Sequence, residues 1–143
     1  MKFDIFEWYD NDRREFVMSD LKVMIIDDSK TIRRTAENLL KKEGCDVVTA
    51  IDGFEALSKI AENKPDIIFV DIMMPRLDGY QTCALIKNNT TFKDTPVIML
   101  SSKDSIFDRA RGRIVGSTEY LTKPFTKEDL IGAIQEYAPQ GGH

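Results

Sequence analysis

Apolar residues fall into two alternating patterns along the chain. Short β-branched or apolar runs of strand length recur five times, at residues 22–26, 46–50, 66–70, 95–100 and 118–122. Between and after these runs, apolar residues recur every three or four positions, which is the period of a helix. The starts of the runs lie 20 to 29 residues apart, so each interval has room for a helix and two short loops. The pattern predicts five βα units.

Residues that commonly start or end helices flank the helical stretches. The start signals, in chain order, are Ser29, Gly53, Gly79, Asp104 and the pair Thr126 and Asp129. The last pair fits a capping box with Asp in place of the more usual Glu. Gly44 is placed to end the first helix, and the second should stop before Pro65. Gly112 weakens the end of the fourth helix.

The predicted strands are apolar on both faces rather than alternating. Residues 67–70 and 97–100 show this most clearly. A parallel sheet with helices on both faces requires such strands. Because βα crossovers are right-handed, the chain should form an α/β fold with a doubly wound, five-stranded parallel sheet.

The two ends of the chain fall outside this scheme. Residues 1–20 carry five aromatic side chains among acidic ones, with a net charge of 3 minus 6, or −3. We expect an N-terminal extension over 1–20, one folded domain over 21–137 and a frayed tail over 138–143. A loosely ordered extension is favoured over an added docking helix. Met18 would itself serve as a start, so the first 17 residues are alternatively not part of the natural protein.

Composition excludes several classes of function. The formal net charge is −4 and no long basic run occurs, so nucleic-acid binding is not expected. No apolar run approaches the roughly 20 residues that cross a bilayer, and the N-terminus does not resemble a signal peptide. We therefore expect a cytoplasmic protein without membrane insertion. Cys45 and Cys83 lack metal-ligand spacing and His143 is the only histidine, which argues against a zinc site or a His-based triad.

Polar side chains follow four of the five predicted strands. Asp27 and Asp28 follow the first strand, Asp71 the third, Ser101 the fourth and Lys123 the fifth. Taken singly, each has an ordinary explanation as a helix cap or a solvated surface group. Ligands of open α/β sheets bind beyond the carboxyl ends of the strands, so these side chains should meet there. Converging carboxylates indicate a divalent cation with oxygen ligands, of which Mg²⁺ is the usual choice.

The same stretches resemble a known family. The motifs are VMIIDDS at 23–29, FVDIMMP at 69–75 followed by DG, MLSS at 99–102 and YLTKPF at 120–125. They resemble the receiver domain of two-component response regulators, in the CheY-like form with no attached output domain, over residues 21–137. The resemblance implies a flavodoxin-like (βα)5 sheet with strand order 2-1-3-4-5. More narrowly, residues 29–37, 73–87 and 112–117 resemble regulators of type IV pilus twitching motility.

The resemblance implies a phosphoacceptor and a metal site. Asp71 would accept a phosphoryl group from a phosphohistidine of a CheA-like sensor histidine kinase. Asp28 would bind Mg²⁺ directly and Asp27 mainly through water. Asp71 and the main-chain carbonyl of Met73 would complete the protein ligands. Because Met73 is not a polar residue that could position water, we expect a longer-lived acyl phosphate than in fast chemotaxis regulators.

The resemblance also implies a switch. Lys123 would pair with Asp71 or the phosphoryl group, and the Ser101 hydroxyl would bond a phosphoryl oxygen. Tyr120 would then move from an exposed to a buried rotamer, and the face made by the fourth helix, fifth strand and fifth helix would change its affinity for a downstream motility or signalling protein. The peptide bond before Pro124 is expected to be cis.

The predicted function is a stand-alone signalling protein and not an enzyme, because it would catalyse only its own phosphorylation and dephosphorylation. One alternative is a phosphate sink that drains the kinase. Another is a phosphatase of the haloacid dehalogenase type, but such enzymes carry a second Asp two residues after the first, where this chain has Met73. Nucleotide-binding glycine motifs are absent from the sequence. We expect a monomer, with dimerisation on activation as the alternative.

Overall fold

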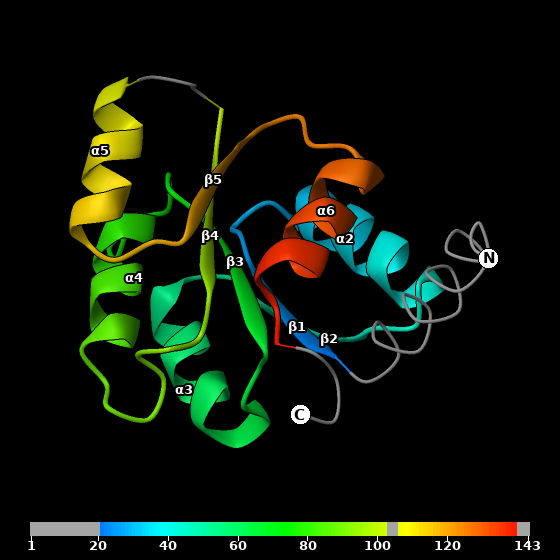
Figure 1. Ribbon diagram of the computed structural model, residues 1–143, viewed down its shortest axis with the longest axis horizontal. Helices are drawn as coiled ribbons and strands as arrows, with labels where there is room; N and C mark the ends of the chain where they lie inside the picture. The colour runs from blue at the N-terminus through cyan, green and yellow to red at the C-terminus, as the bar shows by residue number, and fades with distance from the viewer. Residues whose placement is uncertain (1–20, 103–105, 140–143) are drawn as a thin grey trace, which may run out of the picture.

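The computed structural model describes residues 21–102 and 106–139, which form a parallel sheet with helices on both faces (Figure 1). The strands are β1 (Lys22–Ile26), β2 (Asp46–Ala50), β3 (Ile67–Asp71), β4 (Val97–Ser101) and β5 (Glu119–Thr122). The helices are α2 (Lys30–Lys42), α3 (Gly53–Asn63), α4 (Gly79–Lys87), α5 (Ile106–Ile114) and α6 (Lys127–Tyr137). The strand order β2-β1-β3-β4-β5, with all pairs parallel, confirms the predicted fold class.

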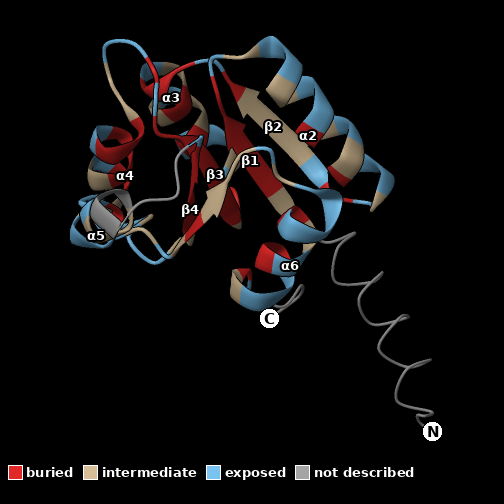
Figure 2. Ribbon diagram, turned by 90° about the horizontal axis from the view of Figure 1, so that it is seen from above, coloured by how far each residue is buried: buried red, intermediate tan, exposed pale blue. Residues whose placement is uncertain are grey.

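The sheet separates two hydrophobic cores. Val23 and Ile25 of β1 face the core beneath α2 and α6, whereas Met24 and Ile26 face the core beneath α3 and α4. Figure 2 shows the buried central strands between helices whose outer surfaces are exposed. This double burial explains why β3 and β4 are apolar on both faces.

Each core contains one free thiol. Cys45 belongs to the core beneath α2 and α6, and Cys83 to the core beneath α3 and α4. Burial raises the pKa of both thiols to about 11.

Most of the helix ends follow the predicted signals. The Ser29 hydroxyl accepts the Ile32 N–H at 3.2 Å and caps α2, and Gly44 follows the helix with φ 94°. Thr126 and Asp129 form the predicted capping box at the start of α6. Asp78 and Gln81 form a second capping box at the start of α4 that the sequence analysis did not single out.

Three strands begin later than predicted, β3 and β5 by one residue and β4 by two. Asp66, just before β3, still bonds to β1: its N–H donates to the Lys22 carbonyl at 2.8 Å, and its carboxylate accepts the Lys22 N–H at 2.8 Å. Helix α5 runs through Gly112 to Ile114. A Cβ at Gly112 would lie 2.8 Å from the Ser117 hydroxyl, so this glycine permits close packing inside the helix rather than ending it. The start predicted near Asp104 lies outside the described residues.

Candidate functional site

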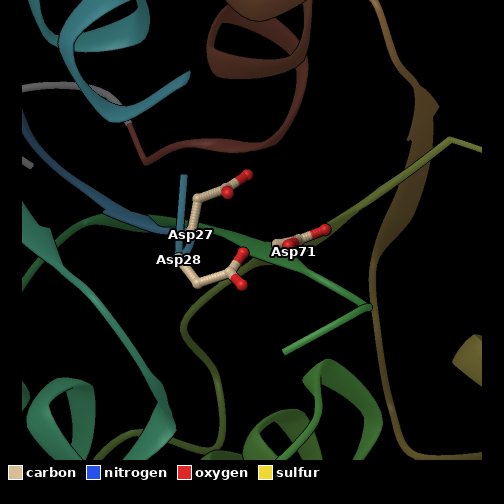
Figure 3. A group of neighbouring side chains, drawn as sticks. All are labelled: Asp27, Asp28 and Asp71. Carbon is tan, nitrogen blue, oxygen red and sulfur yellow. The ribbon is translucent and has the colours of Figure 1, made fainter. Parts of the chain in front are cut away.

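Three carboxylates meet at the carboxyl edge of the sheet. Asp27 and Asp28 follow β1 directly, and Asp71 is the last residue of the neighbouring strand β3 (Figure 3). One oxygen from each carboxylate lies within 4.8 Å of the others. Asp27 and Asp71 are buried, whereas Asp28 is exposed. The parallel topology therefore brings together acids that are more than 40 positions apart in the chain.

Lys123, just after β5, reaches across this edge to two of the acids. Its Nζ lies 2.7 Å from Asp27 Oδ2 and 3.1 Å from Asp71 Oδ1. The predicted partner of Lys123 was Asp71 or the phosphoryl group, and its shorter contact with Asp27 was not predicted. The peptide bond between Lys123 and Pro124 is cis, which is the isomer that the resemblance implies.

Burial dominates the electrostatics of the cluster. It raises the pKa of Asp71 from 3.8 to about 6, with a further increase from the negative charge of Asp27, while Lys123 and the Met73 backbone N–H bond to the carboxylate and oppose the increase. Burial alone would lower the pKa of Lys123, but its hydrogen bonds and charge interactions with Asp27 and Asp71 outweigh burial and raise it. At pH 7 Asp71 is therefore mostly ionised and Lys123 is charged.

Asp27 is held in place by several groups of the chain. Its Oδ1 accepts the Ser29 N–H at 2.9 Å, its Oδ2 accepts Lys123, and its main-chain carbonyl accepts Nη1 of Arg33 at 2.8 Å. Asp28, by contrast, has no hydrogen bond or ion pair with any other described residue. Both oxygens of Asp27 are thus engaged, and those of Asp28 are open to a cation.

Sequence reasoning missed Arg33, although a signal was present. The first turns of α2 contain Lys30, Arg33 and Arg34, and the first turn has no acidic residue. Cations are unfavourable at a helix N-terminus, where the macrodipole is positive. Arg33 nevertheless lies beside the acidic cluster and donates to the main-chain carbonyl of Asp27.

The residues predicted to form the switch lie on the two neighbouring strands. Ser101 ends β4 and is buried. Tyr120 lies in β5 and is only 6% exposed, with the Arg109 guanidinium of α5 at 5.1 Å from its ring centre. The structure therefore has the buried rotamer of Tyr120, and its exchange with an exposed rotamer stays a prediction.

The loop between β3 and α4 forms one side of the site. Met73 is 71% exposed, and its N–H bonds to the Asp71 carboxylate. Farther along the loop, Arg76 Nη2 lies 2.7 Å from Asp52 Oδ2. Met73 offers no carboxylate at the position where a haloacid dehalogenase-type phosphatase needs its second acid.

The donor set suits a hard divalent cation. Carboxylate oxygens are the ligands that Mg²⁺ takes in proteins, and it commonly keeps several waters beside one or two carboxylates. Lys123 neutralises only one of the three negative charges of Asp27, Asp28 and Asp71, so a divalent cation would balance the remainder. The acidic cluster therefore could bind a metal ion.

Comparison with known proteins identifies the family. The family model described as "Response regulator receiver domain" matches residues 23–135. The chain belongs to this family. As a receiver domain it is a two-component signalling domain rather than a classical enzyme, and its pathway includes a histidine kinase.

Individual relatives and structures agree with this assignment. The receiver domain is 78% identical over 119 residues to "Protein PilG" of Pseudomonas aeruginosa, which covers 83% of this chain and 88% of that protein. It is 36% identical over 115 residues to "Response regulator MprA" of Mycobacterium sp. (strain KMS), covering 80% of this chain but only 49% of MprA. The structure of Vibrio cholerae chemotaxis protein CheY4 matches with a TM-score of 0.79 at 35% identity, covering 82% of this chain and 98% of CheY4.

No helix among the described residues has the length and apolar character needed to span a bilayer.

Proposed function

We propose that Asp71 accepts a phosphoryl group from a phosphohistidine of a CheA-like sensor histidine kinase. The observation that carries this proposal is the position of the Asp71 carboxylate, buried at the sheet edge beside two other acids and 3.1 Å from Lys123 Nζ. A carboxylate is a weak nucleophile, so catalysis must come from positioning and from neutralising charge on the phosphoryl oxygens.

The chain's own residues supply both effects. An ionised Asp71 oxygen attacks phosphorus, the P–O bond forms as the P–N bond breaks, and the electron pair of the broken bond stays on the departing imidazole. Lys123 Nζ contacts both Asp27 and Asp71, so its ammonium group can exchange a carboxylate partner for the incoming phosphoryl oxygens. Ser101, at the end of β4, would donate its hydroxyl to another of these oxygens.

Mg²⁺ would supply the remaining positive charge when bound. Asp28, Asp71 and the main-chain carbonyl of Met73 would hold it directly. Asp27 would act mainly through water, which agrees with the engagement of both its oxygens by Ser29 and Lys123.

Signal output would use the face formed by α5, β5 and α6. The phosphoryl contact of Ser101 would stabilise the buried rotamer of Tyr120 and change the affinity of this face for a downstream protein. Tyr120→Ala should therefore keep phosphorylation of Asp71 but weaken phosphorylation-dependent capture of the downstream protein. Loss of phosphorylation in this variant would contradict the role given to Tyr120.

The proposed setting is the cytoplasmic control of type IV pilus twitching motility. Two observations support it: the narrow motifs over residues 29–37, 73–87 and 112–117, and the 78% identity to PilG. We propose that the protein acts as a monomer. Pull-down with and without beryllofluoride, which mimics the acyl phosphate, separates an output regulator from a phosphate sink, since a sink captures no phosphorylation-dependent protein besides the kinase.

Labelling by acetyl phosphate tests the central step. With Mg²⁺ present, the intact mass of the parent should rise by one phosphoryl group, and Asp71→Asn should show no gain. Asp66→Asn is the matched control, because it removes a carboxylate just before the opposite end of β3 and should label like the parent. No labelling of the parent would mean that the receiver fold serves as a phosphorylation-independent interaction module.

A further inference from the structure

Residues 72–78 connect the phosphoacceptor strand to α4, and the structure fixes both ends of this loop. The Ile72 N–H bonds to the Leu100 carbonyl at 2.9 Å, and the Gly79 N–H bonds to the Ile72 carbonyl at 3.0 Å. Met74 packs into the core beneath α3 and α4. The remaining part of the loop is exposed at Pro75 and Arg76 and needs its own anchor.

The backbone of Arg76 has an unusual conformation for a residue with a side chain. Its φ is +68°, and the Leu77 N–H bonds to the Pro75 carbonyl at 2.8 Å, which closes a three-residue turn around Arg76. Turns of this kind with positive φ are rare and strained, and glycine adopts them at the least cost. An arginine here indicates that its side chain contributes something that glycine lacks.

That side chain joins the loop to the start of α3. Arg76 Nη2 lies 2.7 Å from Asp52 Oδ2, and the guanidinium carbon lies 5.3 Å from the Phe54 ring centre. The other oxygen of Asp52 accepts the Glu55 N–H at 2.8 Å and caps α3. One buried carboxylate therefore serves the helix with one oxygen and the loop with the other.

The start of α3 is itself packed firmly against the same loop. A Cβ at Gly53 would lie 2.6 Å from Cδ2 of Leu77, so the helix backbone approaches the loop as closely as a glycine allows. Asp52 thus anchors Arg76 from an element that has little room to move. The loop is held on α3 by an ion pair at Arg76 and by packing at Leu77.

We propose that Arg76 is a positioning residue for the divalent cation. Through its ion pair with Asp52, it holds the loop in the conformation that keeps the main chain of Met73 beside the Asp71 carboxylate. The inference rests on the proposed function, since it assumes that the acidic cluster binds Mg²⁺. Groups that orient metal ligands without touching the metal commonly change metal affinity by about 10- to 100-fold when removed.

Arg76→Gly distinguishes a role in Mg²⁺ binding from a role only in the backbone conformation of the turn. Glycine suits the positive φ but cannot form the ion pair, so the variant should fold at least as readily while its half-saturating Mg²⁺ concentration, followed by amide NMR shifts, rises about ten-fold. Amide exchange of residues 72–78 should also become faster in the metal-free protein. Lys64→Gly is the matched control: Lys64 also has positive φ, 47°, but lies at the far end of α3, so Mg²⁺ binding should not change.

A double-mutant cycle completes the test. Asp52→Asn keeps an oxygen that can cap α3 and removes the charge that holds Arg76. The double variant should bind Mg²⁺ about as weakly as the weaker single variant, because each change breaks the same contact. The inference is overturned if Arg76→Gly binds Mg²⁺ like the parent, or if the two losses multiply independently. A parent that binds no Mg²⁺ at all would instead overturn the proposed function and the inference with it.

Discussion

Replacing Asp71 with Asn should stabilise the protein in the absence of metal. Burial and the charge of Asp27 raise the pKa of Asp71 from 3.8 to about 6. An acid with a raised folded-state pKa contributes stability that is fully present below the unfolded pKa, near 4, and lost as the pH rises through 6. At about 1.4 kcal/mol per pKa unit, the raised pKa of Asp71 lowers the free energy of unfolding by about 3 kcal/mol at pH 7.5, where Asp71 is ionised in the folded protein. At pH 4.5 the loss is only about 1 kcal/mol, because there Asp71 is largely ionised in the unfolded chain but protonated in the folded protein. Asn keeps the shape of the side chain without its charge, so the free energy of unfolding of Asp71→Asn should exceed that of the parent by these amounts.

Urea unfolding in EDTA at the two pH values measures the difference. With a slope of about 1–3 kcal/mol per molar urea, the midpoint of Asp71→Asn should lie about 1–3 M above that of the parent at pH 7.5, and much closer at pH 4.5. Glu62→Gln, at an exposed position of α3, controls for the loss of one negative charge elsewhere on the protein. Saturating Mg²⁺ should reduce the difference between the two urea midpoints, because the metal stabilises chiefly the parent. The reasoning would be refuted if Asp71→Asn were no more stable than the parent at pH 7.5. It would also be refuted if the stability difference between the two proteins were the same at both pH values.

Three further changes test other parts of the site. Lys123→Met leaves two buried carboxylates without their shared cation and should destabilise the protein by about 3–5 kcal/mol at pH 7.5, with recovery toward pH 4.5 in the same urea assay; a loss independent of pH would contradict the pairing. Met73→Asn places a polar group beside the acyl phosphate and should shorten its lifetime, followed by the loss of phosphoprotein mass after donor removal. A parent phosphoryl group that hydrolyses within seconds would contradict the role given to Met73. Ser29→Ala removes the cap of α2 and should cost about 1 kcal/mol in urea, whereas Ser29→Thr should cost less; equal losses would mean that the hydroxyl does not cap the helix.

The sequence was sufficient to predict the fold and the acidic cluster because both depend on chain order. Strands that are apolar on both faces indicate a parallel sheet, and a parallel sheet delivers the ends of its strands to one edge. Asp27, Asp71 and Lys123 follow from that rule, since each lies at a strand end and needs no knowledge of its rotamer. The strand order itself came from the family resemblance.

The contacts that support the site could not be predicted in this way. Arg33 and Arg76 have long, flexible side chains, and nothing in the sequence around them shows which group each one contacts. Arg33 contacts a main-chain carbonyl six positions away, and Arg76 contacts a carboxylate 24 positions away. Such contacts depend on rotamers and on how loops pass each other, which periodicity and strand-end rules do not describe.

The placement of one cysteine in each core gives the protein two built-in reporters of local opening. Cys45 and Cys83 lie on opposite sides of the sheet, so they cannot pair with each other while the sheet is intact. Their raised pKa values and burial make both thiols unreactive in the closed state. A thiol reagent therefore modifies each one only when its own layer opens, and the two modification rates compare the stability of the α2/α6 layer with that of the α3/α4 layer in the unaltered protein.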